Sequence, residues 1–378
     1  MTSVATPVSA FGVFLPVLAS TFGWTRGAIS TALSINMVLG GFVALPIAHV
    51  ADRRGPREVL ALTVLIGGAG FMLMSSVGAL WQMYLFYGVL VGIGFSSVYV
   101  LTMATVSRWF EARRGLALAI VLSGFNLGWL VGGPFAAFLI DRWGWRTAYV
   151  VLGLLVVGVG APACLGARFP ARRAPRDGEA DTASRSHVGA SLRIALRDRR
   201  LWLIGGGWSL CGIVYMMVPV HAVPFARDHG LPLEQASFLL TAYGIGSALG
   251  RLTAGVITDR FGTPATLYGG LAVQALALVV VLTSPPIWLL AAALVAFGMG
   301  SAGADNALVR VIPEVFGVVA LASVMSVISI GWRAGAALGP AAAGFIYDLT
   351  RSYTIPFAAG LAVLATTALL FHRATRRW

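Results

Sequence analysis

The chain has 378 residues, of which 58% are hydrophobic and only 11% carry a charge. Soluble domains carry a charge on about a quarter of their residues, so this composition, with a mean hydropathy of +0.85, excludes an ordinary soluble fold. The net charge of +13 comes from arginines in short clusters between apolar runs, without a single lysine. That placement is typical of membrane topology signals and argues against a nucleic-acid partner.

Apolar runs of membrane-spanning length follow one another along the whole chain. Each contains about twenty residues, enough to cross a hydrocarbon core of about 30 Å as a helix. Twelve such spans are predicted, at residues 4–22, 28–50, 59–78, 82–107, 116–140, 147–167, 201–224, 236–257, 265–284, 287–312, 318–346 and 353–371. The sequence therefore predicts an all-α membrane protein embedded in the lipid bilayer.

A polar stretch divides the spans into two sets of six. Residues 168–200 combine arginines and acidic residues with proline, alanine and serine, which predicts a solvated linker between residues 1–167 and residues 201–378. The end of this linker, residues 191–200, predicts a short amphipathic helix on the membrane surface. Each flanking region is expected to fold as a six-helix bundle.

The arginines outside the spans indicate the orientation in the membrane. An even number of spans places both termini on one side, and twenty arginines of the loops and termini fall on that side. The opposite loops carry five, namely Arg26, Arg142, Arg146, Arg227 and Arg351. The positive-inside rule therefore predicts that the richer side and both termini face the cytoplasm, in a cell inner (cytoplasmic) membrane.

An internal repeat relates the two halves. The segment Ala51-Asp52-Arg53-Arg54-Gly55 recurs as Thr258-Asp259-Arg260-Phe261-Gly262, an offset of 207 residues. Two further pairs repeat at offsets of 207 and 206, namely Asp141 with Asp348 and Pro134 with Pro340. Two parallel repeats of six spans are the architecture of transporters whose halves rock about a central site.

The sequence lacks the residue constellations that enzymes need. Its two cysteines, Cys164 and Cys211, sit in or beside apolar runs, so neither a disulfide nor a metal site is predicted. No pair of nucleophile and base, phosphate-binding loop or metal-ligand spacing is present. We expect no enzymatic activity, no catalytic residue and no cofactor.

The loop between the second and third spans places charges at a helix end. Asp52 precedes Arg53, Arg54 and Arg57, which suits a charge-assisted network that latches one conformation; the alternative is that these arginines only set topology. Residues 46–57 resemble the signature loop of the major facilitator superfamily, although His49 stands where that family usually has glycine. The resemblance implies two pseudo-symmetric six-helix bundles, by analogy a monomer. The latch would comprise Asp52, Arg53, Arg57, Asp259 and Arg260.

Within that superfamily, the chain is most similar to the monocarboxylate and oxalate/formate antiporter branch, over nearly its whole length. Four groups of residues carry the resemblance: Phe11-Gly-Val-Phe14 with Phe22-Gly-Trp24; Arg108-Trp-Phe110 with Arg113-Arg114-Gly115 and Gly144-Trp-Arg146; Gly250-Arg251; and Leu338-Gly-Pro340 through Tyr347-Asp348 to Tyr353. Their order and spacing along the chain match the branch.

Arg251 lies in the middle of the apolar run from Leu239 to Ile257. An arginine at a helix centre costs about 2.5 to 3.5 kcal/mol to insert, so it needs a partner or a water-filled cavity. Its planar guanidinium matches a carboxylate, which predicts a small organic anion as substrate. In the carboxylate-transporting branch the arginine at this place binds the substrate carboxylate, and the resemblance implies that role for Arg251. The alternative is a structural ion pair with Asp305.

Two more charged residues fall inside spans. Arg333 precedes a run of small residues that permits close helix packing, and it either binds substrate in the pore or lies at a helix end. Oxalate-type relatives place a lysine near here, but counting back from Pro340 puts that position at Trp332. Asp305 follows a glycine-rich run and is a candidate for proton coupling in a conformation that separates it from Arg251; a fixed ion pair is the alternative.

Uncharged polar residues complete the set of candidates. Tyr99, ten residues before Trp109, stands where this branch has a tyrosine facing the substrate, and it is a candidate hydroxyl donor to a carboxylate, with packing as the alternative. Asn126 is a further candidate for substrate binding. Weaker candidates are Asn36, Tyr215, Tyr243 and His221, the last of which is expected to be a packing histidine.

These residues together predict a secondary transporter that alternates access and holds a monocarboxylate near Arg251. Protons are the expected coupling ion, although Ser247 and Ser9 stand where the proton-coupled group has an aspartate and a lysine, so that its usual pair is absent. Efflux of lipophilic compounds by the same fold is one alternative. A membrane-embedded sensor or scaffold without transport is another.

Overall fold

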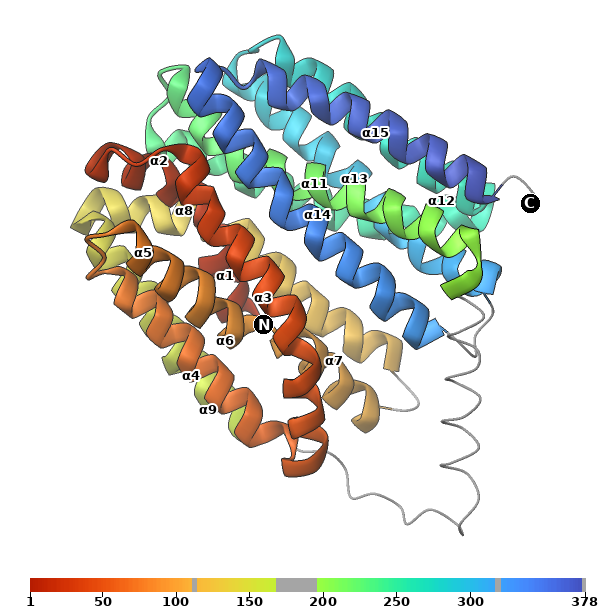
Figure 1. Cartoon of the computed structure of the whole chain (residues 1–378), viewed down its shortest axis with the longest axis horizontal. Helices are drawn as coiled ribbons and strands as arrows, with labels where there is room; N and C mark the ends of the chain where they lie inside the picture. Colours follow the sequence, from red (N-terminus) through yellow and green to blue (C-terminus); the bar gives the residue numbers. More distant parts are fainter. Residues whose placement is uncertain (111–113, 168–195, 317–320, 376–378) are drawn as a thin grey trace.

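The protein is built from helices (Figure 1). The computed structural model describes residues 1–110, 114–167, 196–316 and 321–375, and among these no β-strand occurs. The first half contains α1 (Thr2–Ser9), α2 (Phe11–Phe22), α3 (Arg26–Arg54), α4 (Pro56–Met74), α5 (Leu80–Met83), the π-helix η1 (Tyr84–Val91), α6 (Gly92–Phe95), α7 (Val98–Trp109), α8 (Arg114–Leu155), the π-helix η2 (Val156–Gly160) and α9 (Ala161–Leu165). The second half contains α11 (Arg199–Asp228), α12 (Leu233–Leu282), α13 (Ile287–Phe316), α14 (Leu321–Thr350) and α15 (Thr354–Thr375).

The twelve predicted spans are found once the breaks in the helices are taken into account. Eight described helices are long and apolar enough to cross a membrane, and α1 with α2 forms a further span bent by 40°. Both α8 and α12 merge two spans across a glycine with a non-helical backbone, Gly144 and Gly262. The remaining span is α14, which is 30 residues long. All the helix ends fall within a few residues of the predicted ones.

The predicted linker lies mostly outside the described residues. Residues 168–195, which include half of the amphipathic helix predicted at 191–200, are not among them. After this gap Asp198 caps α11, because its Oδ1 accepts a hydrogen bond from the backbone N–H of Arg200 at 2.8 Å. The bundle boundaries at residues 167 and 201 stay predictions.

The turns between helices repeat from one half to the other. The two repeated segments around Asp52 and Asp259 end at Gly55 and Gly262, whose φ angles are 93° and 85°. Only glycine adopts such angles at low cost, so both repeats end their helix in the same way. At the same offset of 207 residues, positive φ angles also pair Gly23 with Gly230 and Gly144 with Arg351. The backbone thus confirms the repeat seen in the sequence.

Three pairs of the described helices join the halves, and the smallest of these contacts is that of α2 with α11, where Gly12 lies against the backbone of Val220. Helix α3 runs antiparallel to α14, with Gly27 beside Gly344 at one end of the contact and Gly41 beside Arg333 at the other. Helices α8 and α12 form the second contact between the halves. We call these contacts the α3–α14 seam and the α8–α12 seam. Each half contributes one helix to each seam, and the two seams together with the α2–α11 contact hold the halves against each other.

The helix ends define two faces of the molecule. We call the end with Arg53, Arg57 and Arg260 the arginine-rich face, and the end with Arg26 and Arg142 the arginine-poor face. Figure 1 shows α3 (red-orange) and α14 (blue) side by side near their arginine-poor ends and diverging toward the arginine-rich face. The halves are therefore in closest contact at the arginine-poor face and around the middle of the seams.

Glycines let α12 and α13 approach closely. A Cβ atom added to Gly250 would collide with the backbone of Met299, and one added to Gly246 would collide with the backbone of Val295. On the facing helix, Gly298 lies equally close to the backbone of α12. Because small residues permit this contact, α12 and α13 hold Arg251 and the residues around it at a fixed separation.

We expect Gly250→Ala to destabilise the fold by about 1 to 3 kcal/mol, since the added methyl overpacks this contact. The matched control is Gly255→Ala on the same helix, where a Cβ meets no described atom within 4 Å. Thermal unfolding in detergent measures the difference between the two variants. Equal midpoints for both would show that α12 and α13 separate without cost.

Candidate functional site

Arg251 joins the two halves in the α8–α12 seam, on the arginine-rich side of the Thr241–Leu130 and Tyr243–Trp129 contacts. It lies on α12, partly buried, and its Nη1 donates a hydrogen bond to Oδ1 of Asn126 on α8 at 2.7 Å. The side-chain amide of Asn306 on α13 donates to the backbone carbonyl of Arg251 at 3.2 Å. Both Arg251 and Asn126 are candidates for substrate binding from the sequence, and the structure brings them into contact.

The alternative ion pair with Asp305 is not formed in this conformation. Within the described residues, no carboxylate oxygen lies within 4.0 Å of the Arg251 guanidinium. Asp305 lies on α13, and its Oδ1 is buried without a hydrogen-bond partner in the described part of the chain. The guanidinium therefore meets a neutral amide, and a carboxylate nearby is left unpaired.

Tyr99 belongs to the same region. It lies on α7 with 46% of its surface exposed, and its ring packs edge-on against Phe125 at 6.1 Å between centroids. Because Phe125 directly precedes Asn126 on α8, Tyr99 contacts this helix at the level of the pair that joins the halves. Toward the arginine-poor face, Trp129 of α8 meets Tyr243 of α12 at 5.7 Å between centroids.

Arg333 occupies the equivalent place in the other seam. It lies within α14, partly buried, and its side chain packs against Gly40 and Gly41 of α3. Its Nη1 would lie 3.3 Å from a Cβ on Gly40. No described carboxylate lies within 4.0 Å of it. The side chain thus crosses from the second half to the first, and no helix end is involved.

The weaker candidates have structural partners. The amide of Asn36 donates to the carbonyl of Tyr87 at 3.0 Å, and the hydroxyl of Tyr215 donates to the carbonyl of Ser301 at 3.2 Å. His221 is fully buried, and both of its ring nitrogens are hydrogen-bonded. As expected for a packing histidine, it presents no free nitrogen to a ligand.

All five residues of the predicted latch are described and lie in α3, α4 and α12, near the arginine-rich face. Oδ1 of Asp259 accepts a hydrogen bond from Nη1 of Arg310 at 2.8 Å, and the guanidinium of Arg260 lies 5.4 Å from the ring centroid of Phe261. Arg310 was not selected from the sequence, because it lies 51 residues away on α13. The ion pair joins two helices of the same half, so it does not itself connect the halves.

A second group of charges, missed by the sequence analysis, connects the halves at the arginine-poor face. Arg26 at the start of α3 forms a two-pronged ion pair with Asp228 at the end of α11, at 2.6 and 2.7 Å. The carboxylate of Asp348, at the end of α14, accepts hydrogen bonds from the backbone N–H groups of Arg26 and Gly27. In the sequence, Arg26 stands out only as one of the five arginines on the arginine-poor side.

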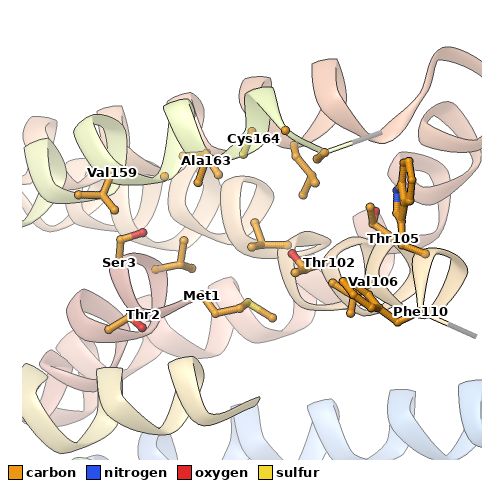
Figure 2. A pocket seen from close by; sticks show the side chains of 18 residues that line it. Met1, Thr2, Ser3, Thr102, Thr105, Val106, Phe110, Val159, Ala163 and Cys164 are labelled. Atoms are coloured by element: carbon orange, nitrogen blue, oxygen red, sulfur yellow. The ribbon is translucent and has the colours of Figure 1, made fainter. Parts of the chain in front are cut away.

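A cavity of about 680 Å³ lies elsewhere, within the first half (Figure 2). Residues of α1, α4, α7, η2 and α9 line it, and its labelled lining residues include Met1, Ser3, Thr105, Phe110 and Cys164. None of the candidate site residues lines it. The cavity is therefore separate from the seams, and we assign it no role in substrate binding.

With this geometry in place, comparison with known proteins identifies the class. A sequence model of the Major Facilitator Superfamily matches residues 2–225 and again residues 214–377. The chain therefore belongs to the major facilitator superfamily, as a transporter of its monocarboxylate branch. This assignment confirms that the protein is a transporter and not an enzyme.

One relative supports the branch, a second supports the superfamily, and a solved structure supports the fold. Monocarboxylate transporter 11 of Homo sapiens is 30% identical over 359 residues, covering 92% of this chain and 74% of the relative. The uncharacterized MFS-type transporter YcxA of Bacillus subtilis (strain 168) is 25% identical over 371 residues, covering 96% and 89%. A crystal structure of a bacterial homolog of the human lysosomal transporter Spinster, inward-facing and unoccupied, matches with a TM-score of 0.74 at 17% identity, covering 99% and 93%.

Proposed function

We propose that the protein carries small monocarboxylates across the membrane by alternating access, with Arg251 as the residue that binds the substrate carboxylate. The observation that carries the proposal is the position of Arg251. Its guanidinium lies in the seam between the halves, bonded to the neutral amide of Asn126 and without a carboxylate partner among the described residues. An organic anion supplies the missing negative charge.

The residues around Arg251 suit the other atoms of such a substrate. Tyr99 brings a hydroxyl to the same region, and Asn126 offers an amide. Arg333 provides a second guanidinium in the opposite seam, also without a described carboxylate partner. A cation of the second half in each of the two seams attracts anions into the interface, while an unpaired cation disfavours a lipophilic cation there.

Protons are the proposed coupling ion, and Asp305 is the residue that carries them. A carboxylate inside a membrane span is costly unless it has a role, and Oδ1 of Asp305 is buried without a described hydrogen-bond partner. Neutralising this group by protonation removes the cost. Coupling follows when protonation of Asp305 and binding of the anion near Arg251 occur together.

The proposal includes the orientation of the protein. The protein lies in the inner (cytoplasmic) membrane of the cell. Its arginine-rich face and both termini face the cytoplasm, in accordance with the positive-inside rule. The described conformation, with closest contact at the arginine-poor face, is then the one open toward the cytoplasm. We propose that the transporter works as a monomer.

Uptake into proteoliposomes tests the substrate class. We expect radiolabelled acetate, propionate, pyruvate or lactate to accumulate when the vesicle interior is made alkaline, and accumulation to vanish when the pH gradient is collapsed. Dicarboxylates and lipophilic cations serve as matched controls. Transport of lipophilic cations without carboxylate flux would replace the proposal with efflux of lipophilic compounds, and binding of a carboxylate without flux would indicate a sensor.

A further inference from the structure

Arg26 is held by two acidic residues that belong to the other half of the molecule. Its Nη2 and Nη1 donate to the two carboxylate oxygens of Asp228 at 2.6 and 2.7 Å. The exposed fractions of the two side chains are only 13% and 28%. Because this pair is two-pronged and largely shielded from water, it is stronger than an ordinary surface ion pair.

Asp348 makes the second connection by capping the helix that Arg26 begins. Its Oδ1 accepts from the backbone N–H of Arg26 at 2.9 Å, and its Oδ2 accepts from the backbone N–H of Gly27 at 2.8 Å. The first N–H groups of a helix have no partner within the helix and carry partial positive charge. The last turn of α14 thus supplies the cap that the first turn of α3 lacks.

The second half presents a preformed surface to the Arg26 side chain. The guanidinium carbon lies 3.8 Å from the ring centroid of Tyr347, and Nη1 donates to the hydroxyl of Tyr353 at 2.8 Å. The two tyrosine rings stack at 4.6 Å between centroids. His221 forms a hydrogen bond with Tyr353, with its Nδ1 at 3.0 Å from the phenol oxygen. The stacking of the two tyrosine rings and the contact with His221 lie within the second half and do not involve Arg26.

Tight backbone packing adjoins these charges. A Cβ atom on Gly27 would collide with the ring of Phe345, and one on Gly344 would lie 2.7 Å from the Cα of Gly27. One step further along the α3–α14 seam, the hydroxyl of Ser34 donates to the backbone carbonyl of Ala337. The charge contacts therefore form only when α3 and α14 are pressed together at this end.

We propose that Arg26, Asp228 and Asp348 form a gate that closes the arginine-poor face of the transporter, which we call the Arg26 gate. All its donors lie on α3 of the first half, and both of its carboxylates lie on α11 and α14 of the second half. Parting the halves at this face breaks all of these bonds together. The gate rests on the proposed alternating access but not on the identity of the substrate.

The gate sets how often the arginine-poor face opens. Each charge-assisted hydrogen bond contributes to the closed conformation, and water replaces only part of that contribution once the halves part. Removing the charge of Arg26 or of Asp228 therefore shifts the population toward the conformation open at this face. The same seam leads inward to Arg333, so opening the gate also uncovers the candidate site from this side.

A cysteine placed in the seam reports on opening. Ala337 is 3% exposed on α14, so Ala337→Cys is shielded while the gate is closed. A membrane-impermeant maleimide added at the arginine-poor face labels it only when the seam opens. The two natural cysteines are buried. The chain without Ala337→Cys measures how much maleimide labels these natural cysteines. Labelling needs no substrate.

We expect Arg26→Gln and Asp228→Asn each to raise the labelling rate at least tenfold, and the double variant to exceed the singles by little, since both remove the same ion pair. Gly27→Ala should also raise the rate, by steric collision and without a change in charge. The matched control is Arg142→Gln, an exposed arginine at the same face outside the gate. It should label at the parent rate.

Each result bears on the gate. Suppose that the parent is labelled at a measurable rate and that the folded variants Arg26→Gln, Asp228→Asn and Gly27→Ala are all labelled no faster. The gate is then wrong, and alternating access stands. If neither the parent nor any variant is labelled at Ala337→Cys, the arginine-poor face never opens, and both the gate and alternating access are wrong. Faster labelling of the gate variants in a protein that moves no monocarboxylate would uphold the gate and reject only the substrate.

Discussion

Replacing Arg251 with glutamine is expected to lower monocarboxylate uptake by about a hundredfold or more. The substrate carboxylate would enter the seam without a cationic partner, and leaving a charge uncompensated in a poorly solvated place costs about 3 to 5 kcal/mol, where each 1.4 kcal/mol corresponds to a factor of ten. Initial uptake rates into proteoliposomes measure the effect. The variant should fold, because the described residues hold no carboxylate that depends on Arg251 for charge balance.

Arg251→Lys separates charge from shape. Lysine keeps the positive charge but loses the planar fork, so we expect uptake to fall by about tenfold, less than with glutamine. Arg142→Gln at the arginine-poor face is the control for the loss of one positive charge. If Arg251→Gln transported at the parent rate, the guanidinium would not contact the substrate and the proposed site would be abandoned.

Asn126 offers an independent check on the same contact. Its Oδ1 accepts the 2.7 Å hydrogen bond from Arg251, so it occupies a place that a substrate carboxylate would compete for. Asn126→Asp should therefore inhibit uptake, because a fixed carboxylate of the protein would pair with the guanidinium. Asn126→Ala should leave the charge of Arg251 available and reduce uptake much less.

The fold could be predicted from the sequence because membrane spans leave a local signal. Each span is long and apolar, and the arginine clusters and the Asp52 and Asp259 segments mark the helix ends and the repeat. The structure breaks α8 at Gly144 and α12 at Gly262, within the gaps at 141–146 and 258–264 that the sequence leaves between predicted spans. By contrast, the π-helical segments η1 and η2 carry no such signal.

The candidate site was predictable only where a charge falls within a span. Arg251, Arg333 and Asp305 stand out because a charge inside a membrane is costly. Arg26 and Arg310 lie at helix ends, where arginines are common for reasons of topology. Their partners lie 202 and 51 residues away in the sequence, and no local sequence pattern predicts a contact over such a separation.

The two sets of contacts between the halves have different chemistry. Within the seams, away from the arginine-poor face, Arg251 meets an amide and Arg333 meets the glycines of α3, so neither cation is neutralised by a described carboxylate. At the arginine-poor face, Arg26 is fully matched by acidic groups. Arginines without a described carboxylate partner suit a site that binds an anion. An arginine paired with carboxylates suits a gate that stays closed in the absence of substrate.

Asp305→Asn is expected to abolish accumulation driven by a pH gradient while exchange of substrate across the membrane continues. Asparagine has nearly the same size and shape, so packing around the buried Oδ1 position is retained, but it cannot take up and release a proton. With one proton per substrate, a gradient of one pH unit is worth about 1.4 kcal/mol, so the parent accumulates substrate about tenfold and the variant not at all.

Asp305→Glu is the matched control, since it keeps a titratable carboxyl group on α13 and should keep part of the accumulation. Counterflow of labelled against unlabelled carboxylate, without a pH gradient, shows whether Asp305→Asn still binds and moves substrate. Continued accumulation by Asp305→Asn under a pH gradient would remove Asp305 from the coupling step. Loss of both accumulation and counterflow would assign Asp305 to the binding site or to the fold instead, because a residue that only carries the proton is not needed for exchange.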